Sequence, residues 1–519
     1  MQYIALTALF YLPVPDNAYN LLCMVPVRHL LTLFFLLSLH PLLAQGPEQP
    51  VRLEFPFDPE TTEAEVIALP DSSLLVYQRT DDVWQTEAHF SFTKYDARLE
   101  PLWSDTVSIT PDSEYLRHYI EGPYIYLIFG ENDLQQYTLV RLNYRTGQAR
   151  HKRHELDQLD AVYEFVVLQG NYFIIGNDRK EQKPLLLHLN GRTGKIQVLP
   201  SVYGEQSSFS DLLTDTARDR VDAVLSESNG RISRLQVKSF DPNGNLISSQ
   251  FILQQENRRL LQAEIAPAYD SRRMLFGTYG TGDLQYNQGF FTAPVTDAVI
   301  DEEGRFYSML DLKNFFRYLK PRQEARTRRR ETERQEDGKN PRYRYRLLLH
   351  DLITTPSGYV LAAEVYYPQY SSSGGSNWGL DRTISMGGRP QQGYKRTHAV
   401  ALGFDKQGTL LWDNIFLLEG IVTYRLVHTV EVSSLPDGRV VMAYPEEEKI
   451  IYRIMDGDKF VDEELELELL TYEEKEKVQE SNPGIIRWYG SNFAAFGFQR
   501  IKPRNSPSRS VFFINKITF

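Results

Sequence analysis

The sequence contains a single cysteine, Cys23, among 519 residues, and this scarcity excludes several kinds of protein. Without a second thiol the chain can form no internal disulfide, no paired-cysteine zinc site and no redox pair. Zinc-protease, nucleophile-elbow and Walker motifs are missing as well. The sequence therefore carries no recognisable catalytic signature, and we expect no cofactor.

Long apolar runs are also lacking. The longest candidate, residues 30–43, spans 14 positions and is interrupted by His40 and Pro41. A helix that crosses a membrane needs about 20 apolar residues in succession, so the sequence predicts no transmembrane helix.

The same run has the features of a secretory signal, because Arg28 precedes it and the small residue Ala44 ends it. We therefore expect a signal peptide over residues 1–44. Met24 opens a conventional signal by itself, which favours an untranslated extension over residues 1–23. The protein is then secreted, periplasmic or exposed on the outer surface of the cell.

Positive charge is in deficit, with 57 Lys and Arg against 68 Asp and Glu, a formal charge of −11. This balance argues against a body that coats nucleic acid, and we expect no sequence-specific nucleic-acid partner. Helical periodicity is almost absent. Short runs of Val, Ile, Leu, Tyr and Phe alternate instead with Asp, Asn, Gly and Pro, which is typical of strands joined by tight turns.

One turn recurs along the chain. An apolar strand ends at Asp or Asn, the chain reverses, usually through a glycine, and a second strand follows. The turn residues are Asp96, Asn143, Asn190, Asp241, Asp405 and Asp456, with a degenerate copy near Asp297. The first four are separated by 47, 47 and 51 residues, and the last two by 51. The chain is therefore a repeat array.

A second recurring turn, at 69–71 and again at 435–438, precedes a further strand, so each unit holds four strands. Units of about 40 to 50 residues with four strands are typical of β-propeller blades. The sequence predicts an all-β protein, a single propeller domain over 45–519 with eight blades; seven is the alternative count. The last unit holds three strands, and we expect the strand 51–55 to complete it and close the ring.

An outer-membrane β-barrel is the alternative all-β architecture, because the chain ends in an aromatic residue and apolar residues share one face of the last strand. Against it, residues 124–129 and 172–175 are apolar on both faces. Strands of this kind are buried on both sides, as in a blade between two neighbours.

Two insertions interrupt the period, at 301–343 and 367–394. The first begins with apolar residues at helical spacing, which predict a helix that ends at Pro321 and packs on the propeller: Phe306, Met309, Leu312, Phe316 and Leu319. The second is rich in Gly and Ser and is predicted to be a long loop.

A basic segment overlaps the first insertion. Residues 320–346 hold 11 Lys and Arg against 5 Asp and Glu, on a body of opposite charge. Such a segment suits a solvated helix, or a weak contact with an anionic surface through Arg328, Arg329 and Arg330.

The candidate ligand-binding residues are His118, His350, Asp351 and His428. The three histidines fall on predicted first strands of different units, at 115–121, 345–353 and 424–432. First strands line the axis of a propeller, so the imidazoles could converge on a metal or an anionic ligand, with Asp351 as a ligand or as a hydrogen-bond acceptor. The alternative is three unrelated histidines, each bonded to a neighbouring strand.

Two resemblances accompany this pattern. Residues 189–195, with an echo at 404–412, are similar to the blade hairpin of quinoprotein-like propellers, although the vicinal cysteines of several quinoprotein dehydrogenases are impossible here. The second half, from about residue 300 to 519, resembles a group of uncharacterised secreted propeller-like proteins of Gram-negative bacteria. That likeness rests on residues 311–316, 345–351, 397–400, 403–405, 411–414, 488–490 and 512–516. It implies secretion and the propeller fold, and it names no ligand.

These observations predict a binding or scaffolding module of the cell envelope whose partner is an envelope protein or polymer. The alternative is a hydrolase or lyase with its acids on one face of the propeller. Convergent carboxylates in a deep central pocket would favour the enzyme, whereas a flat face with exposed aromatic residues would favour binding.

Overall fold

The computed structural model describes residues 46–60, 62–80, 88–111, 113–131, 136–180, 183–200, 207–228, 233–252, 258–269, 272–295, 304–370, 391–418, 420–459, 464–473, 476–503 and 506–519. The chain divides into two units, Met1–Glu48 and Gln49–Phe519. The predicted signal peptide and Met24 lie outside the described residues. The following description concerns the second unit.

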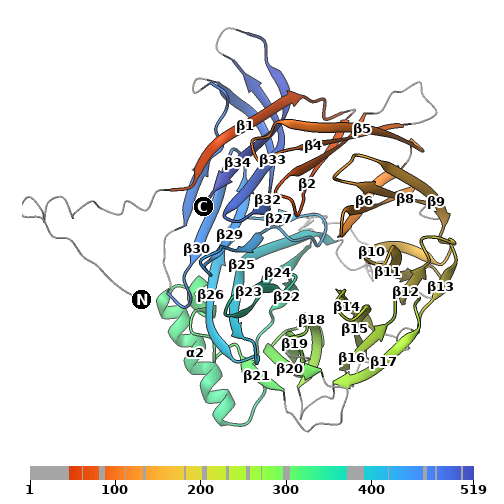
Figure 1. The fold of residues 1–519 in the computed structure, drawn as a ribbon. Helices are drawn as coiled ribbons and strands as arrows, with labels where there is room; N and C mark the ends of the chain where they lie inside the picture. The colour runs from red at the N-terminus through yellow and green to blue at the C-terminus, as the bar shows by residue number, and fades with distance from the viewer. Residues whose placement is uncertain are drawn as a thin grey trace, which may run out of the picture. The chain divides into compact units, whose positions relative to one another are not determined.

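The strands of this unit form eight separate sheets, which follow one another around a ring (Figure 1). Seven sheets are built from consecutive strands, and the eighth joins the two ends of the unit. The protein is an eight-bladed β-propeller, as the repeat predicts, and the separate sheets decide between the two all-β architectures. No helix among the described residues is long and apolar enough to cross a membrane.

Blades 1 to 4 each contain four consecutive strands. From the innermost to the outermost strand of each, they are β2 (Thr62–Ala68), β3 (Leu74–Thr80), β4 (Ala88–Tyr95) and β5 (Pro101–Ile109); β6 (Ser113–Glu121), β7 (Tyr124–Glu131), β8 (Gln136–Asn143) and β9 (Ala149–Glu155); β10 (Leu159–Leu168), β11 (Asn171–Asp178), β12 (Pro184–Leu189) and β13 (Ile196–Val198); β14 (Ser208–Asp215), β15 (Arg220–Ser228), β16 (Ser233–Phe240) and β17 (Leu246–Ile252).

Blades 5 to 8 are less regular. Their strands, in the same order, are β18 (Arg259–Ile265), β19 (Arg273–Gly280), β20 (Gly289–Val295) and β21 (Arg305–Ser308); β22 (Arg346–Leu349), β24 (Gly358–Tyr370), β25 (Gln391–Asp405) and β26 (Leu410–Leu417), with β23 (Ile353–Thr355) on β24 and β27 (Val422–Thr423) on β25; β28 (Glu431–Ser434), β29 (Val440–Glu446), β30 (Lys449–Met455) and β31 (Leu465–Glu468); β32 (Lys477–Tyr489), β33 (Asn492–Lys502), β34 (Arg509–Thr518) and β1 (Glu48–Pro56).

The recurring turn joins the third and fourth strands of a blade. In blade 4, the Asp241 carboxylate accepts backbone hydrogen bonds from Asn243 and Asn245, at 2.8 and 2.9 Å. Asp405 accepts the equivalent pair in blade 6. Gly147 in blade 2 has a φ of 80°, a left-handed conformation that glycine adopts at little cost. The side-chain bonds of these turns therefore account for the repeat seen in the sequence. The degenerate copy near Asp297 lies outside the described residues.

The second strand of each blade packs on both of its faces. On β7, Ile125, Leu127 and Phe129 contact blade 1, whereas Tyr126 and Ile128 contact blade 3. All five are buried. Burial on both sides explains why the sequence of this strand is apolar without alternation.

The ring closes as predicted, because β1 is hydrogen-bonded to β34. Arg52 of β1 donates to Asn515 at 2.7 Å and to Gln499 at 2.8 Å, while Glu54 accepts from Arg509 at 2.9 Å. The ring of Phe55 stacks on Phe512, with centroids 5.2 Å apart. Closure thus combines a strand ladder with a polar network.

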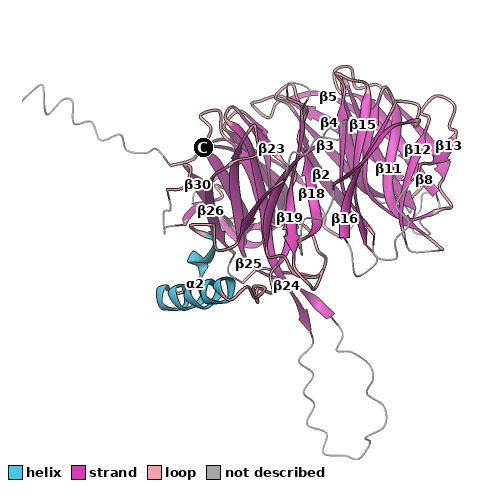
Figure 2. Cartoon of the chain, turned by 90° about the horizontal axis from the view of Figure 1, so that it is seen from below, coloured by secondary structure: helices cyan, strands magenta, loops and turns pink. Residues whose placement is uncertain are grey.

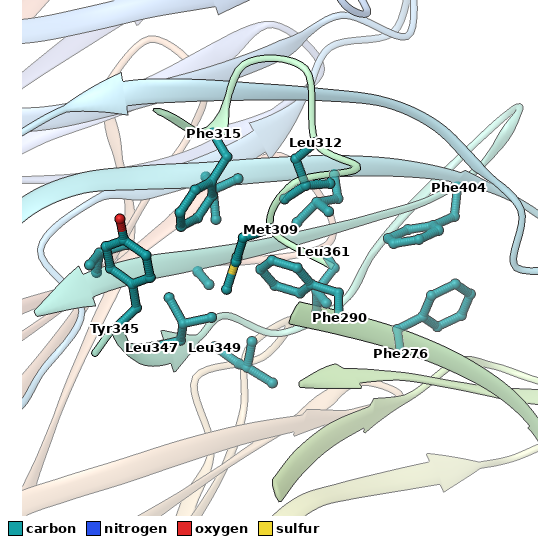
Figure 3. Packing of buried hydrophobic residues seen from close by; sticks show 14 of the residues in the cluster. Phe276, Phe290, Met309, Leu312, Phe315, Tyr345, Leu347, Leu349, Leu361 and Phe404 are labelled. Carbon is teal, nitrogen blue, oxygen red and sulfur yellow. The ribbon is translucent and has the colours of Figure 1, made fainter. Parts of the chain in front are cut away.

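The helix predicted over the first insertion is wrong in its position. Phe306 belongs to β21, and residues 315–318 form the short 3₁₀ helix η1 (Phe315–Tyr318). The apolar side chains do pack on the propeller, where Met309, Leu312 and Phe315 fill a core shared by blades 5 and 6 (Figure 3). Burial against the sheets, and not a helix, therefore explains their spacing.

The α-helix α2 (Pro321–Glu336) begins at the proline where the predicted helix ends, because proline is well tolerated in the first helical turn. It lies outside the sheets (Figure 2). Arg328 attaches it to the preceding loop, with bonds to the carbonyls of Leu312 and Lys313 at 3.0 and 2.8 Å. Arg329 and Arg330 are largely exposed.

The second insertion extends a hairpin. Residues 367–370 of β24 pair with residues 391–395 of β25, so the ends of the predicted loop are strands. Paired backbone groups need no particular side chain, which is why the composition alone indicated a loop. Residues 371–390 lie outside the described residues.

Candidate functional site

The innermost strands of blades 2 to 5 share a β-bulge. The register with the second strand shifts by one residue at Leu116, Tyr163, Ser210 and Leu261. The residues directly after the bulge are polar: Arg117, Glu164, Asp211 and Gln262. Bulges redirect side chains and are common beside functional sites. Four blades therefore present polar groups at one level of the ring.

Carboxylates dominate this level. We call Glu164, Asp211, Glu264 and Asp351 the axial acidic cluster; they come from blades 3, 4, 5 and 6. Burial raises the pKa of Glu164 to about 8, with repulsion from Asp211 and Asp351 adding to the shift. Burial likewise raises the pKa of Asp211 to about 7, and that of Glu264 well above its ordinary value. Acids that repel one another across four blades must lie close together.

The members of the cluster are held differently. Asp211 accepts two backbone hydrogen bonds, from Leu212 at 2.6 Å and from Ile265 of the next blade at 2.7 Å. Glu164 and Glu264 accept no hydrogen bond from any residue that the structure describes. The side chain of Glu264 is nevertheless 93% buried, since it is only 7% exposed. These two carboxylates are therefore the members that a ligand can engage.

Positive charge near the cluster comes from Arg117 of blade 2. Its charge lowers the pKa of Glu164 and opposes the effect of burial. Its guanidinium is held by a hydrogen bond to the Tyr163 carbonyl at 3.0 Å. It forms no ion pair with a carboxylate of the described chain, so it moderates the negative potential without cancelling it.

His118 lies on the innermost strand β6, as predicted. Its Nδ1 is 2.6 Å from the Tyr115 hydroxyl. The side chain is accessible to solvent but has protein on most sides, and this environment, with the charge of Arg117, lowers the pKa of His118 to about 4. The imidazole is therefore neutral at physiological pH.

His350 and His428 are brought together, although neither lies in a strand. The two rings stack with centroids 4.1 Å apart. His350 follows β22 in a break of the innermost strand, and His428 precedes β28. The predicted first strands at 345–353 and 424–432 are thus wrong in extent.

Glu364 of β24 explains why the segments around His350 and His428 are not strands. It accepts backbone hydrogen bonds from Thr429 and Val430, at 2.7 and 3.0 Å, and it lies 3.2 Å from His350 Nε2. Burial alone would raise the pKa of Glu364, but the hydrogen bonds from His350 and Thr429 lower it to about 2. A buried carboxylate takes the place of a strand ladder here and fixes the loop before blade 7.

Asp351 projects from the same break and is exposed. It joins the axial acidic cluster through its repulsion of Glu164, Asp211 and Glu264. Across the described ranges, no group of three or more His, Cys, Asp or Glu side chains is arranged to hold a metal ion. The structure thus joins two of the three predicted histidines, and Asp351 acts electrostatically both on His428 and on the axial acidic cluster.

Sequence reasoning missed Glu164, Asp211 and Glu264, although a signal was present for the first two. Arg117, Glu164, Asp211 and Gln262 each lie 21 residues after a recurring turn residue, at Asp96, Asn143, Asn190 and Asp241. The period of the turns could therefore have been applied to the polar residues of the first strands.

The fold and this cluster together define a β-propeller with an acidic centre. No protein-family model matches the chain, and no curated protein matches it either. The crystal structure of the polysaccharide lyase Uly1 is 8% identical, with a TM-score of 0.38 over 77% of this chain and 89% of that chain. The β-propeller domain of the Trilobed protease from Pyrococcus furiosus is 7% identical, with a TM-score of 0.31 over 76% and 94%.

A prolyl endopeptidase structure is 9% identical, with a TM-score of 0.38 over 84% of this chain and 53% of that one. The TM-scores of these likenesses are all below 0.5. They say nothing about a reaction or ligand of this chain.

Proposed function

We propose that the protein is a secreted or envelope-associated binding module whose ring centre takes a cationic group of its partner. The observation that carries this proposal is the axial acidic cluster. Bulges in the innermost strands of blades 3 and 4 direct Glu164 and Asp211 to it, and burial with repulsion from neighbouring acids raises the pKa of Glu164, Asp211 and Glu264. Strongly shifted pKa values that arise from burial and from a specific charge partner are typical of functional sites.

Electrostatics explains why a cation fits. Glu264 is buried and Glu164 is half-buried, and neither accepts a hydrogen bond from a described residue, so ionising them costs free energy. A cation that approaches both relieves the repulsion and drives out their protons. The favoured ligand is an organic amine or guanidinium, because such groups bind carboxylates through charge-assisted hydrogen bonds and can contact more than one of them.

Isothermal titration calorimetry with spermidine and with hexa-arginine tests the proposal. We expect the chain to bind at pH 8.5 and the variant Glu164→Gln/Glu264→Gln to bind at least about tenfold more weakly. The matched control is Glu155→Gln/Glu468→Gln, which removes the same charge from exposed positions on the outer strands β9 and β31. Equal affinities of the two variants, or no binding by the parent chain, would overturn the proposal.

A hydrolase or lyase is the second candidate, and the pKa of Glu164 favours it. A carboxyl group that holds its proton to about pH 8 can donate it to a leaving group at neutral pH, while a second carboxylate of the cluster acts as the base. Product release from a panel of polysaccharides and peptides, lost in Glu164→Gln and retained in Glu155→Gln, would support this candidate. Binding of both cationic probes without any product would leave the first.

The location in the envelope belongs to the same proposal and rests on the features of residues 1–44. Fractionation of cells that express the tagged full chain tests it, with the tag expected outside the cytoplasm. The exposed side chains of Arg329 and Arg330 support a weak, salt-sensitive contact with an anionic surface, whereas Arg328 holds α2 in place. Liposome binding that persists in Arg329→Gln/Arg330→Gln would contradict that contact.

A further inference from the structure

A pocket of about 660 Å³ lies between blades 2 and 3, within the size range of small-molecule sites. Basic side chains dominate its lining: Arg141, Arg150, His151, Lys152, His154 and Arg192. Neither Asp nor Glu is among the lining residues. A body with a net charge of −11 thus has a basic pocket.

The sheet register forces these charges together. Arg141 on β8 and Arg150 on β9 are directly opposite partners in the antiparallel ladder. Lys152 lies two residues after Arg150, so it shares the same face of the strand. Like charges directly opposite in a sheet are destabilising, and this hairpin therefore holds its cations at a cost.

No acid of the described chain neutralises the group. Arg150, Lys152 and Arg192 form no ion pair there, and Arg141 lies over the ring of Tyr124 at 4.7 Å. Glu121, a nearby carboxylate, accepts hydrogen bonds from the backbone amides of Gln169 and Gly170 and forms no ion pair with these cations. Because the basic side chains outnumber this one acid, the basic pocket keeps a net positive charge.

Blade 3 contributes neutral hydrogen-bond donors to the pocket, and two of its turns pack closely together there. The side-chain amide nitrogens of Asn171 and Asn190 donate no hydrogen bond to a described residue, so they are available to a ligand. Asn171 instead uses its oxygen to accept from the Gly191 backbone at 3.1 Å. A Cβ at Gly191 would lie 2.0 Å from the Gly170 carbonyl, so glycine is required where the two turns meet.

We propose that this basic pocket binds a small molecule that carries two or more phosphate, sulfate or carboxylate groups. The guanidinium groups of Arg141 and Arg150 pair with two oxygens of one anionic group, while Lys152 and Arg192 reach a second. The amides of Asn171 and Asn190 bond to the neutral part of the ligand. Binding offsets the repulsion within the hairpin, which is the physical reason for the site.

Calorimetry at low ionic strength tests the proposal with three probes: inorganic pyrophosphate, a sulfated disaccharide and citrate. We expect the chain to bind at least one of them, with affinity that falls as salt is added. The variant Arg150→Gln/Lys152→Gln should bind at least about tenfold more weakly. The matched control Arg145→Gln/Arg153→Gln removes two charges from the same hairpin, and Arg153 lies on the other face of β9, paired with Glu131.

His154 provides a second readout. Burial and the neighbouring charge of Lys152 lower the pKa of His154, so a bound anion should raise it in an NMR titration. The probe that raises this pKa identifies which of the three oxyanion classes the pocket takes. No binding of any probe by the parent chain, equal binding by the two double variants, or an unchanged His154 titration would overturn the proposal.

Discussion

The axial acidic cluster and the basic pocket are both groups of like charges that lack neutralising partners, but they are assembled in opposite ways. The cluster takes one carboxylate from each of four blades, whereas three of the four main cations of the pocket come from a single hairpin, β8 and β9. The cluster therefore depends on the relative positions of four blades, and the pocket on those of two adjacent blades.

This difference shows in which parts of the propeller repulsion between like charges is tolerated. Packing of the second strands supplies the stability, so residues on the innermost strands and in the turns can be arranged for a ligand. In both regions an unpaired set of charges is more informative than any single residue. The predictions below separate the two regions, beginning with the largest effect.

Removal of β1, residues 48–56, should affect the two regions unequally. Loss of the closing strand and of the Arg52 network should lower the melting temperature by about 5 °C or more. Binding of hexa-arginine should weaken more than binding of pyrophosphate, because the cluster relies on the positions of four blades and the basic pocket on those of two. Arg52→Ala should give a smaller change in the same direction. A melting temperature equal to that of the parent chain would refute closure by β1.

The pH dependence of stability should reflect the cluster. The folded chain holds the Glu164 proton to about pH 8, whereas an unfolded chain releases it near 4.5. The folded state therefore binds more protons in this interval, and stability should fall as pH rises from about 4.5 to about 8. Thermal melts of Glu164→Gln/Glu264→Gln should show a shallower fall, and those of Glu155→Gln/Glu468→Gln the parent slope. Parallel curves for all three would contradict the assignment.

Reversal of one charge in the basic pocket should have the smallest effect on stability. Arg150→Glu places an opposite charge across from Arg141 and should stabilise the fold by about 0.5 kcal/mol while it weakens anion binding. Arg153→Glu breaks the pair with Glu131 on the other face and should destabilise it slightly. Urea unfolding measures both. A loss of stability in Arg150→Glu would show that the cations do not repel.

Several elements could be predicted from the sequence because their cause is local. The Asp and Asn residues of the recurring turn bond their own backbone, so the turns are visible as a pattern. The spacing of Met309, Leu312 and Phe316 led to an incorrect helix prediction, because burial between blades 5 and 6 imposes a similar pattern without a helix. The histidine prediction captured the proximity of His350 and His428, but not Glu364, which lies on a different strand and fixes the loop.

The sequence by itself predicted the repeat of four-stranded blades, the closing strand and the apolar second strands, since each follows from turn chemistry or from burial on both faces of one strand. It favoured eight blades over seven, and the eight sheets of the structure settled that count. Only the tertiary structure decided which charges meet. A bulge of one residue directs Glu164 and Asp211 to one level of the ring, and a break in blade 6 adds Asp351 to them. Repulsion depends on distance through space, which spacing along the chain does not specify.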